Sequence, residues 1–250
     1  MTHVFVHGNP EVDAIWEPLV AALTARGIAD IVLLSPPGFG SPTPDGWDAS
    51  MESYANWLIT EVEPLEAPVH LVGHDWGAGH VLGLLARRPD LVATWAADIV
   101  GIIHPDYQWH DAAQAWQTPD VGEQVIHAMV AMTLDERTAA FGGLGLPDNV
   151  LAKIAGGVNA EMGRCILGLY RDATQPATAQ LGERLTGVGL PPGLGIIATA
   201  DSYVPAELCI AATSTLGAAE LRLEGLGHWW MVEDPDQAAD GLVDFWARSA

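Results

Sequence analysis

A carboxylate between two glycines, in the first third of the chain, is the side chain best placed to do chemistry. The stretch Gly73-His74-Asp75-Trp76-Gly77 follows an apolar run at 68–72, which predicts a buried strand. It precedes residues 78–88, which predict a helix that ends before Pro89. A strand, a tight turn and a helix are the setting of the G-x-S-x-G nucleophile elbow, where one side chain is exposed at the end of a strand. Here that side chain is Asp75.

An aspartate in the nucleophile position predicts a reaction in two steps. A carboxylate that displaces a leaving group at an sp³ carbon forms an ester whose carbonyl belongs to the protein, and water must then hydrolyse that ester. Such a reaction needs a base, oxyanion donors and a group that stabilises the leaving atom. We expect the backbone N–H groups of Trp76 and Asn9 to be the oxyanion donors, each contributing about 3 kcal/mol.

The predicted base is a histidine near the C-terminus. His228 follows a predicted strand and a Gly-Leu-Gly loop, so we expect it to take a proton from the water that attacks the ester. Asp201 follows another predicted strand and is the expected acid that orients His228, with Asp98 as the alternative acid. We expect His74 to support the elbow, and His104 and His110, which flank the entrance of the predicted cap, to line the wall near the site.

The chain alternates between predicted strands and helices, except in its middle. Apolar runs predict strands at 3–6, 31–34, 68–72, 95–100, 194–198 and 220–223, and helical spacing predicts helices at 16–26, 51–63, 78–88 and 235–247. Between 103 and 190 several helices are expected without a strand, which predicts a helical cap inserted into a core made of residues 1–102 and 191–250. Alternation of this kind predicts an α/β fold with an open parallel sheet that binds ligands beyond the carboxyl ends of its strands.

The composition excludes several classes of partner. With 32 acidic and 10 basic residues in 250, the formal charge of −22 repels nucleic acid and anionic membranes. No apolar run is long enough to span a bilayer and no signal peptide is evident, so we expect a cytoplasmic protein. Cys165 and Cys209 are expected to be buried thiols in helices. No spacing of possible ligands resembles a metal site, and we expect no cofactor. The sequence leaves open whether the protein forms a homodimer.

The elbow, the His7-Gly8 turn, Asp201 and the segment 225–230 around His228 together resemble the α/β-hydrolase fold. Within it they resemble the aspartate-nucleophile branch, which contains epoxide hydrolases and haloalkane dehalogenases. The resemblance spans the chain apart from the middle of the cap, and it implies a small, largely apolar organic substrate. Because the chain begins on what would be the third strand of the family, we expect about six strands without the usual first antiparallel pair.

The leaving group distinguishes the two enzyme classes of that branch. Asn9 and Trp76 resemble the pair that binds halide in many haloalkane dehalogenases, and residues 114–122 resemble the start of their cap. In contrast, residues 166–171 resemble the cap segment of epoxide hydrolases that supplies a tyrosine, here Tyr170, to the epoxide oxygen. An epoxide needs such a donor because its leaving group is an alkoxide, whereas a halide needs no proton.

The family usually has two cap tyrosines, and a second one is not clearly matched. The side chains that would have to take its place are Tyr107, Trp109 and Trp116. We expect an epoxide hydrolase, with a haloalkane dehalogenase as the alternative. An ester or lactone hydrolase, or a ligand-binding module of the same fold, are further alternatives.

Overall fold

The chain folds around one parallel sheet. The computed structural model describes residues 1–66, 68–142 and 145–249. Its sheet has the strand order β2-β1-β3-β4-β5-β6, and every pairing in it is parallel. The strands are β1 (Thr2–Val6), β2 (Ile31–Leu34), β3 (Val69–Gly73), β4 (Thr94–Ala97), β5 (Gly193–Ala198) and β6 (Ala219–Leu223). The predicted parallel sheet of about six strands is confirmed.

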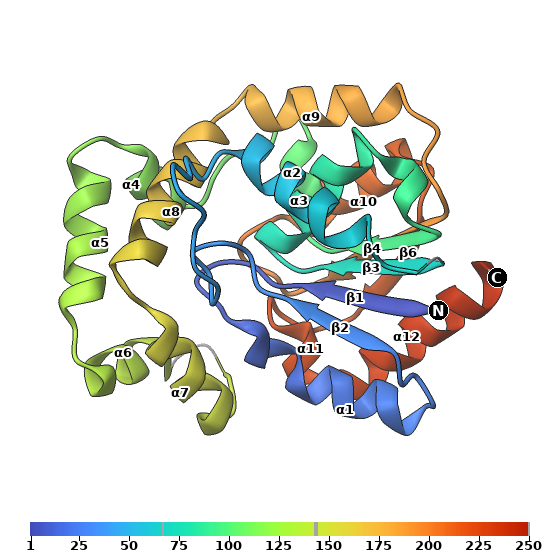
Figure 1. The fold of residues 1–250 in the computed structure, drawn as a ribbon, viewed down its shortest axis with the longest axis horizontal. Helices are drawn as coiled ribbons and strands as arrows, with labels where there is room; N and C mark the ends of the chain where they lie inside the picture. Colours follow the sequence, from blue (N-terminus) through green and yellow to red (C-terminus); the bar gives the residue numbers. More distant parts are fainter. Residues whose placement is uncertain (67, 143–144, 250) are drawn as a thin grey trace.

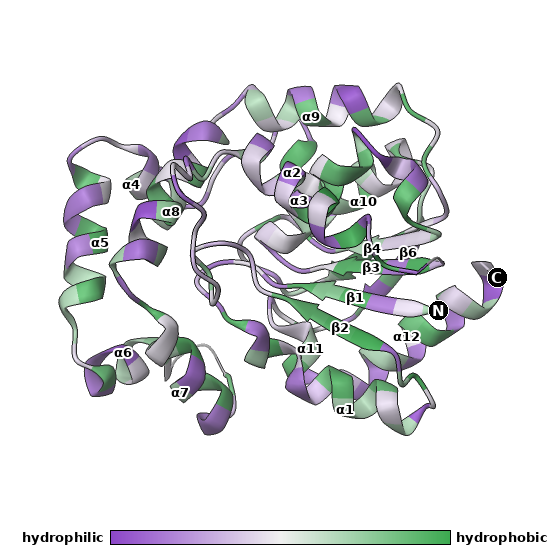
Figure 2. Ribbon diagram, viewed as in Figure 1, coloured by the Kyte–Doolittle hydropathy of each residue, from purple (hydrophilic) through white to green (hydrophobic). Residues whose placement is uncertain are grey.

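Helices cover both faces of this sheet (Figure 1). One face carries α1 (Glu17–Ala25), α11 (Trp230–Glu233) and α12 (Pro235–Ser249). The other carries α2 (Met51–Val62), α3 (Trp76–Leu85), α9 (Ala177–Thr186) and α10 (Ala206–Thr215). Side chains alternate between the faces of a strand, so Val4 and Val6 join the core under α2 and α3, while Phe5 joins the core under α1 and α12. Figure 2 shows hydrophobic residues along much of the sheet and in the helices that cover it.

Between β4 and β5 the described residues form helices and short turns of 3-10 helix, and no strand. Five of these helices, which we call the inserted helices, lie beyond the carboxyl ends of the strands (Figure 1). They are α4 (Asp111–Gln117), α5 (Val121–Ala131), α6 (Leu134–Phe141), α7 (Asp148–Gly157) and α8 (Ala160–Asp172). They therefore stand over the edge of the sheet where the predicted catalytic side chains follow their strands.

Several elements differ from the sequence prediction. The strand expected at 95–100 ends at Ala97, because Ile99 has a left-handed backbone with φ of 42° and the chain turns into the 3-10 helix η3 (Val100–Ile103). No helix was predicted at the positions of α6 and α9: α6 is rich in polar and charged residues and has little apolar periodicity, and the large apolar side chains of α9 are only Leu181 and Leu185. Cys165 and Cys209 are buried in α8 and α10, as predicted.

The remaining elements are the 3-10 helices η1 (Asp13–Trp16) and η2 (Pro89–Leu91). Among the described residues, none of the helices combines the length and the apolar character that crossing a bilayer requires.

Candidate active site

The turn after β3 places Asp75 in a strained conformation at the head of α3. Asp75 has φ of 51° and ψ of −127°, a region that residues other than glycine rarely adopt. The flanking glycines serve close packing: a Cβ on Gly77 would lie 2.0 Å from the carbonyl oxygen of Val6, and one on Gly73 would lie 2.6 Å from Cα of Ala78. The turn, β1 and α3 can therefore approach each other only with glycine at both positions.

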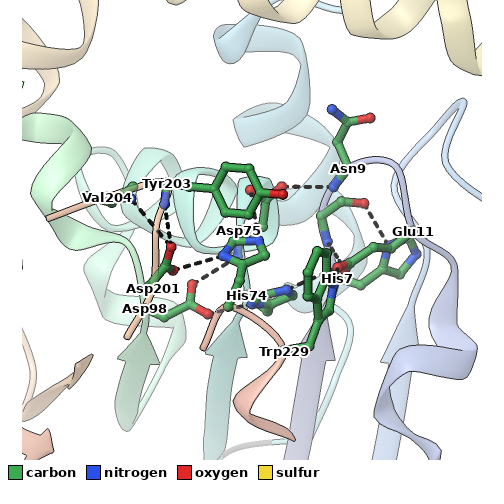
Figure 3. Close-up of polar contacts among 12 residues, drawn as sticks. His7, Asn9, Glu11, His74, Asp75, Asp98, Asp201, Tyr203, Val204 and Trp229 are labelled. Carbon is green, nitrogen blue, oxygen red and sulfur yellow. Dashed lines mark hydrogen bonds and ion pairs between the residues drawn. The ribbon is translucent and has the colours of Figure 1, made fainter. Parts of the chain in front are cut away.

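The carboxylate of Asp75 is held on one oxygen and open on the other. The backbone N–H of Asn9 donates to Oδ1 at 2.8 Å, and Oδ2 lies 3.6 Å from Nε2 of His228. Burial raises the pKa of Asp75 from 3.8 to about 6, and the nearby charges of His228 and His74 act in the opposite direction. Figure 3 shows the amide group of Asn9 pointing away from the carboxylate while its backbone faces Oδ1.

His228 is oriented by Asp201. Nδ1 of His228 donates to Oδ2 of Asp201 at 2.8 Å, and Oδ1 of Asp201 accepts from the backbone N–H of Tyr203 at 2.7 Å. Burial opposes the charged form of His228, but the hydrogen bond to Asp201 and the charge of Asp75 outweigh it and raise the pKa. The structure thus brings Asp75, His228 and Asp201 together in one row.

The alternative acid, Asp98, faces a different histidine. Oδ2 of Asp98 lies 2.5 Å from Nδ1 of His74, and Oδ1 accepts from the backbone N–H of Asp75 at 2.8 Å (Figure 3). On its other side, Nε2 of His74 lies 3.1 Å from Oε1 of Glu11. His74 therefore supports the elbow, as expected, through two buried acids.

Tyr170 of α8 reaches the site from the inserted helices. Its hydroxyl accepts from Nδ2 of Asn9 at 3.4 Å, and its ring meets the indole of Trp76 edge-on, with centroids 5.5 Å apart. Burial and the charge of Asp75 raise the pKa of Tyr170 well above its usual value, while the contacts with Asn9 and Trp76 lower it. The phenol is therefore protonated at neutral pH and can donate a hydrogen bond.

A small cavity of about 180 Å³ lies above Asp75. Its walls are largely apolar and come from loops at the sheet edge and from the inserted helices: Asn9, Pro10, Asp75, His110, Ala112, Trp116, Met129, Phe141, Tyr170, Tyr203, His228 and Trp229. His110 is a wall residue, as predicted, whereas His104 is not part of this lining. Trp76 is not part of this lining; its indole packs between Tyr170 and Trp109.

The three predicted substitutes for a second cap tyrosine lie in different places. Tyr107 donates its hydroxyl to the carbonyl of Tyr203 at 3.3 Å, and Trp109 donates its indole N–H to the carbonyl of Ala173 at 3.2 Å. Neither lines the cavity. Trp116 does line it, and its buried Nε1 has no hydrogen-bond partner among the described residues. Of the three, Trp116 is the one that lines the cavity and whose donor has no partner among the described residues.

Sequence reasoning missed two side chains of the site. Glu11 directly follows Asn9-Pro10 and is almost completely buried. Burial raises the pKa of Glu11, but the charge of His74 outweighs this effect and lowers that pKa to about 2. Tyr203 stands against His228 with ring centroids 4.7 Å apart. An acidic residue directly after a predicted strand-end turn was the available signal for Glu11. Tyr203 was visible only as a neighbour of Asp201.

One group of side chains has the donor types of a metal site. Candidate ligand atoms of Glu11, His74 and His228 lie within 4.8 Å of one another. Both ring nitrogens of His74 already contact carboxylates, and Glu11 accepts from the indole N–H of Trp229 at 2.6 Å. The hydrogen bonds among these groups account for their positions without an ion.

Comparisons with known proteins agree with this architecture. The sequence model of a family described as the alpha/beta hydrolase family matches residues 4–240. A haloalkane dehalogenase of Mesorhizobium japonicum is 30% identical over 137 residues, which are 50% of this chain and 42% of that protein. An (E)-2-((N-methylformamido)methylene)succinate hydrolase of Acinetobacter baylyi is 30% identical over 94 residues, which are 37% of this chain and 35% of that protein. The aligned part thus spans about two fifths of these curated relatives or less.

Solved structures match over almost the whole chain. A loop variant of a haloalkane dehalogenase from Bradyrhizobium elkanii has a TM-score of 0.72 at 22% identity, covering 100% of this chain and 91% of that one. An esterase from Thermogutta terrifontis has a TM-score of 0.76 at 17% identity, covering 100% and 90%. At these identities the likeness concerns the fold, and the fold predicted from the sequence is confirmed.

Proposed function

Because the chain belongs to the alpha/beta hydrolase family, we propose that it is a cofactor-independent hydrolase in which Asp75 is the nucleophile. The observation that carries this proposal is the geometry of one carboxylate. Oδ1 of Asp75 accepts from Asn9, while Oδ2 faces Nε2 of His228 at 3.6 Å, and His228 is held by Asp201. Oδ2 attacks the substrate carbon, and Oδ1 becomes the ester carbonyl oxygen beside the Asn9 N–H.

Formation of the ester prepares His228 for the second step. The charge of Asp75 contributes to the raised pKa of His228, and esterification removes that charge. The pKa of His228 therefore falls in the intermediate, which favours the neutral imidazole. Nε2 then takes a proton from water as the water oxygen attacks the ester carbonyl, whose oxygen is stabilised by Asn9. The bond between the carbonyl carbon and Oδ2 breaks, His228 returns the proton to the departing alkoxide, and the new carboxyl group of Asp75 ionises.

We propose an epoxide as the substrate class, because of Tyr170. Its hydroxyl oxygen accepts from Asn9, so its own proton is available to a substrate oxygen in the cavity that Tyr170 shares with Asp75. An epoxide oxygen needs this donor when the ring opens, and the product is a vicinal diol. The side chains of Asn9 and Trp76, which would hold a halide, both interact with this phenol.

The size and the lining of the cavity limit which substrates can bind. At about 180 Å³ it lies below the usual range for ligand pockets, and Met129, Phe141 and Trp229 make its walls apolar. We propose a small, largely apolar epoxide, covered by the inserted helices acting as a cap. Its outer wall includes α4, α5 and α6 through Ala112, Met129 and Phe141.

A trapped intermediate tests the nucleophile. His228→Gln should still be alkylated but should not release the product, so its intact mass should rise by the mass of an added epoxide. Peptide mapping should place the adduct on Asp75, and Asp75→Asn should stay unmodified under the same conditions. Absence of any adduct from a broad panel of small epoxides and haloalkanes would sink the covalent mechanism.

A second variant tests the leaving-group donor. Tyr170→Phe should lose epoxide turnover by about 10²- to 10⁴-fold, because no acid remains for the ring oxygen. Tyr107→Phe is the matched control, since Tyr107 itself is not part of the cavity lining and its hydroxyl donates to the backbone carbonyl of Tyr203. Unchanged epoxide turnover in Tyr170→Phe would remove the assigned role of Tyr170.

Haloalkane dehalogenation is the second candidate. It is favoured by relatives named haloalkane dehalogenase and by Asn9, which lines the same cavity as Asp75. Release of bromide from short bromoalkanes measures it directly. For this activity Tyr170→Phe should retain most of the rate, because a halide leaves without a proton, and Asn9→Ala should lose it.

A further inference from the structure

A second row of acid, histidine and acid lies beneath Asp75. It consists of Glu11, His74 and Asp98, which we call the lower row. Figure 3 shows the two acids on opposite sides of His74. The contacts are 3.1 Å from Nε2 of His74 to Glu11 and 2.5 Å from Nδ1 to Asp98, and all three side chains are almost completely buried. The reaction proposed above does not use this row.

The geometry of the lower row fixes the charge of its histidine. An ionised carboxylate only accepts hydrogen bonds, so a ring that contacts a carboxylate through each nitrogen must carry a proton on both. Burial works against this charge, but the charges of Glu11 and Asp98 outweigh it and raise the pKa of His74 well above its usual value. His74 is therefore an imidazolium ion inside the protein.

The two acids of the lower row accept hydrogen bonds from the elbow and from the loop that carries Asn9, the proposed oxyanion donor. Oδ1 of Asp98 accepts from the backbone N–H of Asp75 at 2.8 Å. Oε2 of Glu11 accepts from the backbone N–H of Gly8, the residue before Asn9, at 3.3 Å. Each acid thus contacts His74 through one oxygen. Its other oxygen accepts a hydrogen bond from the backbone of a loop that carries a reacting group.

The same acids also fasten the loop of the base. The two residues after His228 are tryptophans whose indole N–H groups point back to the lower row. Trp229 donates to Oε1 of Glu11 at 2.6 Å, and Trp230 donates to Oδ2 of Asp98 at 2.7 Å. The ring of His74 lies against that of His228, with centroids 4.7 Å apart. The loops that carry Asp75, Asn9 and His228 are therefore all connected to the charged His74 through its two acids.

We propose that His74 is a positioning residue whose permanent positive charge holds Glu11 and Asp98 in place and, through them, fixes Asp75, Asn9 and His228 relative to one another. This inference rests on the proposed function, in which these three groups react. Without the charge, two buried carboxylates would face each other across a neutral ring beneath a third, Asp75, and their repulsion would separate the loops.

The charge also acts directly on the reacting groups. The ionisable side chains that face His74 are His7 and Glu11 after β1, Asp75 beside it, Asp98 after β4 and His228 after β6. Among these, the charge of His74 lowers the pKa of both Asp75 and His228. It therefore favours the ionised nucleophile and the neutral base, which are the forms that the two steps require.

The protonation state of His74 can be measured without any substrate. In protein labelled with ¹⁵N-histidine, His74 should show both ring nitrogens protonated from pH 6 to pH 9. His80 serves as an internal reference, because burial lowers its pKa to about 3 and its Nε2 has no partner among the described residues. A neutral His74 at pH 7 would overturn the inference, whether or not the protein turns over an epoxide. His74→Gln identifies the signals.

The functional effect is tested with a pair of charge variants. His74→Gln leaves two unbalanced acids, so the acid limb of kcat/KM should move up by about one pH unit or more and the rate at pH 6 should fall about tenfold. Glu11→Gln combined with His74→Gln removes one charge of each sign and should move the limb back toward wild type. A purely structural role predicts a further loss in the double variant, and that result would overturn the inference.

Failure of each idea has its own signature. If neither wild type nor variants form an adduct with any substrate, the proposed function fails, while the NMR result still decides the charge of His74. If His74→Gln does not fold, Glu11→Gln alone replaces it: His74 should then lose its proton at a lower pH than in wild type, and an unchanged titration would contradict the role of Glu11.

Discussion

His228 and Asp201 meet through a single hydrogen bond of 2.8 Å from Nδ1 to Oδ2. The other oxygen of Asp201 accepts from the backbone N–H groups of Tyr203 and Val204, so the carboxylate cannot turn away from the ring. This arrangement leaves Nε2 of His228 directed at Asp75, at the place that the proposed second step assigns to the attacking water. Asp98 makes no such contact, because it is occupied by His74.

Replacement of the orienting acid should stop the second step and spare the first. Asp201→Asn should slow ester hydrolysis by about 10²- to 10⁴-fold, since the amide no longer selects the tautomer with a free Nε2. The alkylated protein should then accumulate during turnover, as intact mass would show. Asp172→Asn is the control, because Asp172 accepts from the backbone N–H of Met51 outside the cavity. Equal turnover in both variants would contradict the pairing.

The first step should depend on the ionisation of a single buried acid. Burial raises the pKa of Asp75 to about 6, and the carboxylate attacks only when ionised. The rate constant kcat/KM, which reports on the free protein, should be half-maximal near pH 6 and fall about tenfold per pH unit below it. A profile that stays flat down to pH 4 would show that Asp75 titrates as an ordinary aspartate.

The same shift should make Asp75 a cost to stability at neutral pH. Its pKa is about 6 in the folded protein and 3.8 ordinarily, so the folded state binds this proton more tightly than the unfolded state. The stabilisation is complete below pH 3.8 and is lost as pH rises through 6, a difference of up to about 3 kcal/mol. Asp75→Asn has no such loss. Its free energy of unfolding in urea should exceed that of wild type at pH 8 and approach it at pH 4; the reverse order would contradict the shift.

A tryptophan should supply the second donor to the leaving oxygen. Trp116 lines the cavity with its ring 4.7 Å from that of Tyr170, and its buried Nε1 has no partner among the described residues. Trp116→Phe keeps the apolar surface and removes the donor, so kcat/KM for epoxides should fall about tenfold. Trp47→Phe is a matched control, since its Nε1 is also buried without a described partner but lies outside the cavity lining. An equal effect of both would point to packing.

The elements that carry the reaction were predictable where the signal is local. Asp75 lies in a turn between an apolar strand and a helix, and His228 and Asp201 each follow a strand, so a parallel sheet must bring them to the same edge. The pairing of Asp201 rather than Asp98 with His228 was not decidable, because both acids follow neighbouring strands.

The remaining parts depend on contacts between distant segments. Glu11 acts through His74, which is 63 positions away, and no spacing in the chain relates the two. From the sequence, Tyr107, Trp109 and Trp116 were equivalent candidates for the second donor to the substrate. Only the three-dimensional packing shows that Tyr107 and Trp109 donate to backbone carbonyls. Helix α9 was missed because it has few large apolar residues, Leu181 and Leu185, to mark a buried face.

The hydrogen bond from Asn9 to Oδ1 of Asp75 makes the two carboxylate oxygens unequal from one catalytic cycle to the next. If Oδ1 stays with that N–H throughout, Oδ2 leaves in the product, and the incoming water oxygen takes its place. Each product molecule then carries the oxygen that water delivered in the preceding cycle. In H₂¹⁸O the first product should be unlabelled and every later one fully labelled, while a freely rotating carboxylate would mix the isotopes. The oxygen isotope in each product would thus come from the water that entered one turnover earlier.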